Sequence, residues 1–292
     1  MLDRIQKVVG SDYLENITSP SLDQWGDFIL KLGFELTRKV RQNRFNQTKM
    51  ETLIKTDGSP STDFEFSLES YARIKLQKLC SNSELLGEEH AKPKSNSKYY
   101  LIMDPIDGTR SFLAYFDTFS ISLAILHGEE IQASIISSPA CGDIYFRQGN
   151  ESSKLITIPL YSKEFQIFDL PLEPNGEEDT ILVNIHPSKK AKELIAKNYD
   201  LWRSRKIQLV KSISGSPSLS IVKVALGTEY YINMWEDHKT EPYDLLAAMH
   251  ILNGAKGSIL DGEGNMIDPE HHRGMFIAGI NKKVVNHIIK LL

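Results

Sequence analysis

The chain has 292 residues, of which 41% are hydrophobic, and 34 basic residues against 38 acidic ones give a net charge of −4. The charges are interspersed, so no basic stripe argues for a nucleic-acid partner, and no apolar run reaches the length of a membrane span. The two cysteines, Cys80 and Cys141, match no zinc spacing and are expected to be reduced thiols. Residues 1–7 lack the apolar core of a signal peptide, so a cytoplasmic protein is predicted.

The first part of the chain predicts two amphipathic helices. Apolar residues recur at three- and four-residue steps over residues 21–43, which open on a Ser-x-x-Gln capping box. A polar turn over residues 55–60 follows. The second helix is predicted to begin at Thr62, with Glu65 as the partner in its own capping box.

From residue 119 the hydrophobic period changes to two, which predicts strands. Apolar residues alternate over 119–126 and 131–135, and a further apolar run covers 144–146. Turn residues separate these segments, so an antiparallel meander is predicted, packed on the two helices.

The last part of the chain alternates strand and helix. Strands are predicted at 181–185, 207–210, 230–234, 258–260 and 275–278, and helices at 188–198, 216–226, 244–252 and 282–291. Residues 170–179, with two prolines and an acidic run, form the best linker candidate. The pattern predicts two lobes, an α+β lobe over 1–170 and an α/β lobe with a mixed sheet over 171–292.

One strand end concentrates potential ligands. Residues 99–103 predict a buried strand, and the run Asp104-Pro105-Ile106-Asp107-Gly108-Thr109 follows it directly. Two carboxylates three residues apart can hold a hard cation, and free N–H groups just beyond them can bind a phosphate. Gly108 lets the backbone and a ligand approach closely. The alternative interpretation is an ordinary turn, since Asp, Pro and Gly are frequent turn residues.

Three further motifs have ordinary interpretations when each is taken alone. Gly87-Glu88-Glu89 is typical of a solvated turn, and both Pro242-Tyr243-Asp244 and Gly215-Ser216-Pro217-Ser218 are typical of helix caps. Together with the strand end, they supply carboxylates without histidine or cysteine, which favours magnesium or manganese over zinc. Asp104 would then bridge two ions, with Glu88 on one and Asp107 and Asp244 on the other.

The glutamate pair, the Asp-Pro-Ile-Asp-Gly-Thr run and the late aspartate together resemble the inositol monophosphatase superfamily, whose members are magnesium-dependent and often lithium-sensitive phosphomonoesterases. The resemblance extends from the turn at 55–60 to the closing helix and implies a layered α-β-α-β-α sandwich of the sugar phosphatase type. It implies two or three Mg²⁺ ions, with Mn²⁺ as a substitute. Glu88, Asp104 and the carbonyl of Ile106 would hold one ion, and Asp104, Asp107 and Asp244 the second.

The resemblance also implies catalytic and substrate-binding roles. Thr109, together with Glu88, would orient and activate the attacking water, and the N–H groups of Gly108 and Thr109 would bind phosphate oxygens. Ser216 is a further candidate for binding the substrate anion. Asp237 lies where the family contacts substrate hydroxyl groups.

The sequence gives conflicting indications of the substrate. Tyr243 stands where the family commonly has tryptophan, and Arg110-Ser111-Phe112 resembles the histidinol-phosphate phosphatase branch, whereas the strand at 119–126 resembles the inositol branch. The leading hypothesis is a small polyol or sugar phosphate such as inositol-1-phosphate. Histidinol phosphate and 3′-phosphoadenosine 5′-phosphate are alternatives.

A function of another class is also considered, namely a catalytically silent phosphate-binding protein with the same fold. The complete carboxylate set and the presence of Thr109 argue against it. The expected partner is a small phosphate monoester, with no nucleic acid and no membrane, and the resemblance implies a homodimer.

Overall fold

The computed structural model describes residues 1–46, 50–56, 58–90, 97–158, 164–172, 180–184, 209–212, 215–227, 230–233 and 240–291, together with 193, 196, 199, 200 and 203. Helix α1 (Leu2–Gly10), which was not predicted from the sequence, packs on α2 (Leu22–Phe45), and α3 (Asp63–Leu79) follows. The predicted capping box at the start of α2 is confirmed, because Ser21 Oγ accepts from the Gln24 N–H and the Gln24 side chain accepts from the Ser21 N–H.

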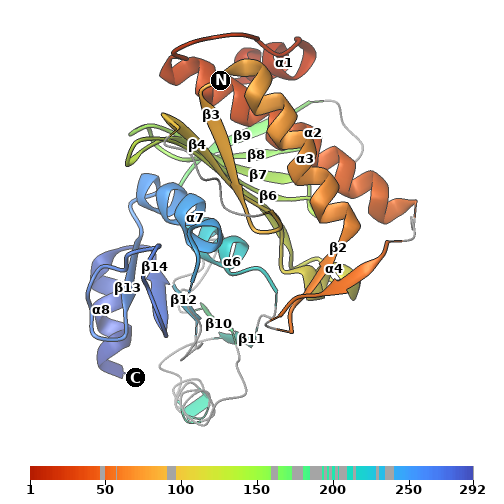
Figure 1. The fold of residues 1–292 in the computed structure, drawn as a ribbon. Coiled ribbons are helices and arrows are strands. Elements are labelled where there is room, and N and C mark those ends of the chain that lie inside the picture. The colour runs from red at the N-terminus through yellow and green to blue at the C-terminus, as the bar shows by residue number, and fades with distance from the viewer. Residues whose placement is uncertain are drawn as a thin grey trace.

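A seven-stranded sheet forms the layer beneath α2 and α3 (Figure 1). Its strands lie in chain order: β3 (Ser83–Gly87), β4 (Tyr99–Asp107), β5 (Ser120–His127), β6 (Glu130–Ser138), β7 (Asp143–Gln148), β8 (Lys154–Thr157) and β9 (Gln166–Asp169). All neighbouring pairs are antiparallel except β3 and β4, which run parallel. The predicted meander is therefore present, and one parallel strand is added at its edge.

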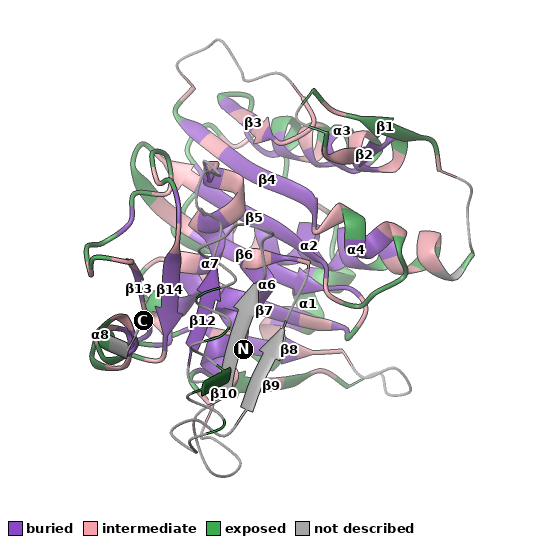
Figure 2. Cartoon of the chain, turned by 90° about the horizontal axis from the view of Figure 1, so that it is seen from below, coloured by how far each residue is buried: buried purple, intermediate pink, exposed green. Residues whose placement is uncertain are grey.

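The period of two in the meander assigns its side chains to the two faces of this sheet. On β5, Leu123 and Ile125 belong to the core beneath α2 and α3, whereas Ala124 belongs to the core on the opposite face. Both cores consist of buried apolar side chains, and the central strands are buried along most of their length (Figure 2). The sheet is thus covered by helices on both faces, as its long apolar strands require.

The opposite face of the sheet packs on α6 (Pro217–Lys223), which continues as the 3₁₀ turn η1 (Val224–Leu226), and on α7 (Pro242–Gly254). Beyond these helices lies a second sheet, with the strand order β11 (Leu209–Ser212), β10 (Thr180–Asn184), β12 (Tyr230–Asn233), β14 (Phe276–Gly279) and β13 (Ser258–Asp261). β10 pairs in parallel with both of its neighbours, and β14 pairs antiparallel with both of its own. The second sheet is therefore mixed, as predicted.

Helix α8 (Lys282–Leu291) packs on β13 and β14 and completes the sandwich (Figure 1). The order of layers is helix, sheet, helix, sheet, helix, which confirms the predicted α-β-α-β-α architecture. Most of the predicted helix at 188–198 and most of the predicted linker at 170–179 lie outside the described residues, and the boundary between residues 170 and 171 stays a prediction. No helix among the described residues is both long and apolar enough to cross a bilayer.

A short hairpin and a short helix contribute to a pocket at the end of β4. β1 (Thr52–Ile54) and β2 (Pro60–Thr62) form an antiparallel hairpin that leads into α3. α4 (Thr109–Leu113) is a single short helix that begins directly after β4.

Candidate active site

A pocket of about 510 Å³ opens at the end of β4, where α4, α6 and α7 meet. Four carboxylates line it, and they come from three separate parts of the chain: Glu88, Asp104, Asp107 and Asp244. The pocket is also lined by Ile106, whose backbone carbonyl is a candidate ligand, and by Gly108 and Thr109. The motifs that the sequence singled out therefore converge on one site.

The Asp-Pro-Ile-Asp run continues β4 instead of following it. The strand was predicted to end at residue 103, but it extends to Asp107 and its register on β5 shifts between Asp104 and Asp107. Pro105 has no N–H to donate to the ladder, which accounts for an irregularity here. Inside the irregular segment the Ile106 N–H donates to Asp104 Oδ1 at 2.9 Å, which fixes that carboxylate.

Gly108 ends the strand in a left-handed conformation, with φ of +92°, and serves as the N-cap of α4. A Cβ atom here would lie 2.9 Å from the Ser216 backbone nitrogen and 3.1 Å from the Thr118 carbonyl oxygen. Both the backbone conformation and the close approach of α6 therefore require glycine.

Asp107 is held by donors from β5 and from the start of α6. Its Oδ2 accepts from the Ser216 hydroxyl, from the Ser218 N–H at 3.0 Å and, more weakly, from the Ser120 hydroxyl at 3.4 Å. Ser216 Oγ also caps α6 by accepting from the Leu219 N–H at 2.8 Å. The Ser216 hydroxyl, predicted to bind substrate, is thus engaged with Asp107 and with its own helix.

Asp244 stands in the first turn of α7 and is not its N-cap, contrary to the ordinary interpretation of the sequence. The N-cap is Glu241, whose N–H donates to Asp244 Oδ2 at 2.8 Å. Asp244 is therefore the third-position partner of a capping arrangement. One carboxylate oxygen fixes the helix start, and the side chain still lines the pocket.

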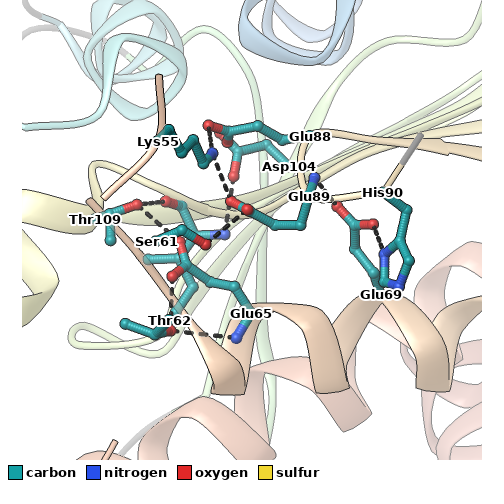
Figure 3. Close-up of polar contacts among 11 residues, drawn as sticks. Lys55, Ser61, Thr62, Glu65, Glu69, Glu88, Glu89, His90, Asp104 and Thr109 are labelled. Carbon is teal, nitrogen blue, oxygen red and sulfur yellow. Dashed lines mark hydrogen bonds and ion pairs between the residues drawn. The ribbon is translucent and has the colours of Figure 1, made fainter. Parts of the chain in front are cut away.

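Lys55, which directly follows β1, forms ion pairs with Glu88 and Glu89 (Figure 3). Its Nζ lies 2.6 Å from Glu88 Oε1 and 2.7 Å from Glu89 Oε1, and the Ser61 hydroxyl donates to Glu89 Oε2 at 2.6 Å. Burial opposes the charged ammonium, but the two carboxylates outweigh it and raise the pKa of Lys55. Sequence reasoning missed Lys55, because 33 positions separate it from Glu88.

Thr109 has a partner that sequence reasoning also missed. Its hydroxyl donates to Glu65 Oε1 at 2.8 Å and lies 3.2 Å from the Ile106 carbonyl oxygen. Glu65 Oε2 accepts from the Thr62 hydroxyl at 2.6 Å, and the Glu65 N–H donates back to Thr62 Oγ1 at 3.3 Å (Figure 3). Half of the predicted capping box is therefore present, but the Glu65 carboxylate reaches hydroxyl groups instead of the backbone. Burial, partly offset by these hydroxyl donors, raises the pKa of Glu65 to about 7.

The carboxylates of the pocket act on one another electrostatically. Burial raises the pKa of Asp104 well above its usual range, and the charges of Glu88, Asp107 and Asp244 raise it further. Burial is also the main cause of the raised pKa of Asp107 and of Asp244. Buried acids that repel one another are relieved by a bound cation.

The donor set fits a hard divalent ion. It consists of oxygen atoms, which Mg²⁺ prefers, and Mg²⁺ keeps several water ligands of its own. In the described part of the chain, no three His, Cys, Asp or Glu side chains group into a ready-made cage.

The predicted site residues are distributed as follows. The pocket is lined by Glu88, Asp104, Ile106, Asp107, Gly108, Thr109 and Asp244. Ser216 contacts Asp107 between two pocket-lining neighbours, Gly215 and Pro217. Asp237 lies outside the described residues.

Comparison with known proteins identifies relatives in the family that the sequence motifs resemble, and the similarity covers nearly the whole chain. The model of the inositol monophosphatase family matches residues 22–291. The chain is 24% identical over 286 residues to an inositol monophosphatase of Dictyostelium discoideum, covering 96% of this chain and 97% of the relative. It is also 24% identical over 242 residues to the 3′(2′),5′-bisphosphate nucleotidase CysQ of Haemophilus influenzae, covering 80% of this chain and 82% of the relative.

A solved structure shows the same fold. The IMPase/NADP phosphatase complexed with Mg²⁺ and phosphate superposes with a TM-score of 0.70 at 18% sequence identity, over 94% of this chain and 96% of that one.

Proposed function

Because the chain belongs to the inositol monophosphatase family and is a phosphomonoesterase of that family, we propose that it hydrolyses a small phosphate monoester with a magnesium-activated water. The observation that carries the proposal is the convergence of four carboxylates and Thr109 on one pocket. The Mg²⁺ and phosphate in the related solved structure support the same metal and the same substrate group here.

We assign the metal ions to the carboxylates that line the pocket. Glu88, Asp104 and the Ile106 carbonyl would hold one, and Asp104, Asp107 and Asp244 the other. When bound, Mg²⁺ would lower the pKa of a coordinated water and offset charge on the phosphate. Ser216 would act through Asp107, whose orientation it fixes, instead of contacting the substrate.

Thr109 orients the attacking water in this proposal. Because its hydroxyl proton is donated to Glu65, the lone pairs of its oxygen are left to accept a hydrogen bond from water. Glu88, which also lines the pocket, supplies the second acceptor for this water. The water oxygen bonds to phosphorus while the bond from phosphorus to the ester oxygen breaks, and the alcohol leaves with a proton. The N–H groups of Gly108 and Thr109 are assigned to the phosphate oxygens.

A small polyol or sugar phosphate, such as inositol-1-phosphate, is the first substrate to test, because the sequence predicts it and a relative that aligns over the full length is an inositol monophosphatase. Histidinol phosphate and 3′-phosphoadenosine 5′-phosphate complete the panel. The nucleotide is included because a second relative is a bisphosphate nucleotidase.

Phosphate release should vanish after exhaustive chelation and return on addition of Mg²⁺, because the pocket offers oxygen ligands and no His or Cys among its described lining residues. The measurement is phosphate release across the panel, before and after chelation. Full activity in metal-free protein would refute the metal-dependent mechanism. Binding of phosphate without turnover on any substrate would instead favour the catalytically silent binder. Lithium inhibition and homodimer assembly stay predictions, which LiCl in the same assay and sedimentation test directly.

Replacing Asp244 by asparagine should separate its two roles. The amide oxygen of asparagine can still accept from the Glu241 N–H, so the helix start is kept, whereas the negative charge is lost. We expect Mg²⁺ affinity to fall at least about tenfold, since even indirect partners of metal ligands are worth about 10- to 100-fold. The melting temperature in chelator should be unchanged or higher, because a repelled buried charge is removed.

Calorimetric titration and thermal unfolding measure these two quantities. Asp143→Asn is the matched control, because Asp143 lies on β7 outside the pocket lining and accepts from Thr157 Oγ1 at 3.0 Å. An Asp244→Asn protein with wild-type Mg²⁺ affinity would reduce Asp244 to a helix-capping residue.

A further inference from the structure

The loop that follows α4 is held in a strained conformation at the rim of the pocket. Tyr115 has a φ of +60°, a left-handed value that is unusual for a bulky side chain. Arg44 of α2 donates to the Tyr115 carbonyl oxygen at 2.6 Å, to the Phe116 carbonyl oxygen at 3.1 Å and to Asp117 at 2.9 Å. The Phe116 N–H donates to the Ser111 carbonyl oxygen at 2.9 Å. These bonds fix the loop, and strain held in this way is frequent at ligand sites.

The fixed loop presents an aromatic ring at the site. Phe116 lines the pocket and is 59% exposed. A rigid exposed ring costs little entropy when a flat group stacks on it. Tyr115 is equally exposed but does not belong to the pocket lining.

Arg110 stands on the same rim, in the first turn of α4. It is the single cationic side chain among the pocket-lining residues that the structure describes. Its Nη2 donates to the Gly58 carbonyl oxygen at 3.0 Å, which anchors the exposed guanidinium against the β1–β2 hairpin. A guanidinium has five N–H donors, so most of them remain for a ligand.

The pocket is lined by charges of both signs. In the proposed function its carboxylates hold the metals that bind the hydrolysed phosphate, whereas Arg110 offers a positive charge to the rest of the ester. A second phosphate on the leaving group is attracted there, because guanidinium binds phosphate with bidentate, charge-assisted hydrogen bonds.

We infer that Arg110 and Phe116 form a specificity subsite for the leaving group, which selects esters that carry a second phosphate and a flat ring, the chemistry of a nucleoside bisphosphate. This inference rests on the proposed function, since it concerns the same pocket. Arg110 binds the second phosphate, and Phe116 stacks against the ring.

Four substrates separate the two features. 3′-Phosphoadenosine 5′-phosphate has both, adenosine 3′-monophosphate has only the ring, fructose-1,6-bisphosphate has only the second phosphate, and inositol-1-phosphate has neither. The measurement is kcat/KM on each, with saturating Mg²⁺. The wild-type protein should prefer the first substrate to the last by about a hundredfold, since each contact is expected to contribute about tenfold.

Variants at both positions test which contact acts on which substrate. Arg110→Gln should lower kcat/KM about tenfold on the two bisphosphates and leave the two monophosphates within about twofold, and Arg110→Lys should restore part of the loss. Phe116→Leu should lower kcat/KM about tenfold on the two adenosine compounds only. The matched controls are Tyr115→Leu on the same loop and Arg38→Gln, an exposed arginine of α2 outside this pocket.

The outcomes distinguish the inference from the proposed function. No hydrolysis of any of the four substrates would count against the proposed function itself. If the wild type hydrolyses the substrates but Arg110→Gln lowers kcat/KM equally on all four, Arg110 only stabilises the hairpin through Gly58. That result would refute the specificity subsite and leave the proposed function intact. Unchanged selectivity in both variants would refute the subsite as well.

Discussion

An Asp104→Asn protein is expected to keep its fold and to lose nearly all turnover. Asp104 is 2% exposed, and it alone is assigned to both metal ions. Asparagine has the same shape and can still accept from the Ile106 N–H, so β4 should form as before. The charge shared by the two ions is lost, and kcat should fall by at least about three orders of magnitude, since metal activation and charge neutralisation together account for several kcal/mol.

Steady-state kinetics at saturating Mg²⁺, together with thermal unfolding in chelator, measure the two effects separately. Without metal, the asparagine protein should be at least as stable as the wild type, because burial and the neighbouring acids already disfavour the Asp104 carboxylate. The Asp143→Asn protein should match the wild type in kcat. Wild-type turnover in Asp104→Asn would show that the bridging assignment is wrong.

The second large effect is expected at Thr109. Thr109→Ala removes the oxygen that would hold the attacking water, and positioning effects of this kind amount to about two to four orders of magnitude in kcat. KM should change little, because the metals and the backbone N–H groups still bind the phosphate. Thr109→Ser keeps the hydroxyl and its bond to Glu65, so it should remain active.

Glu65, which accepts a hydrogen bond from the Thr109 hydroxyl, allows a double-mutant test of the same role. If Glu65 acts by orienting the Thr109 hydroxyl, Glu65→Ala should lower kcat in the wild-type background but add little in the Thr109→Ala background, since the two residues act as a unit. Mg²⁺ affinity is measured alongside in all four proteins. Additive losses, or a Thr109→Ala protein that binds metal weakly but keeps kcat, would contradict the water-orienting role.

The fold was predictable where its signals are local and repeat many times. The apolar period over residues 21–43 and its capping box correspond to α2, and the alternation after residue 119 corresponds to the meander from β5 onward. The end of β4 at Asp107 was less predictable, because it depends on an irregular pairing with β5 around Pro105. Parallel pairing of β3 and β4 has no local signature either, since β3 has only two adjacent leucines and its sequence does not indicate the direction in which it pairs.

For the site, the sequence predicted which acids come together, whereas their supporting partners were missed. Three of these partners are ordinary polar residues in their own segments: Lys55 contacts Glu88, Glu65 contacts Thr109, and Ser120 contacts Asp107. Their roles depend on contacts across 33, 44 and 13 positions, which no periodic pattern encodes. Glu65 shows the difficulty well, because its spacing from Thr62 fits a capping box and so conceals the contact with Thr109.

The serines that donate to Asp107 determine when the site can be completed during synthesis of the chain. Ser216 and Ser218 lie 109 and 111 positions after Asp107, and Asp244 follows them. During synthesis, a nascent chain that has emerged through β9 already contains Glu88, Asp104 and Asp107, but it lacks both the donors from the start of α6 that orient Asp107 and the last carboxylate. Contacts this far apart in sequence form after the local ones. The proposed metal site is therefore complete only once the chain through α7 has been synthesised and has packed on the first sheet.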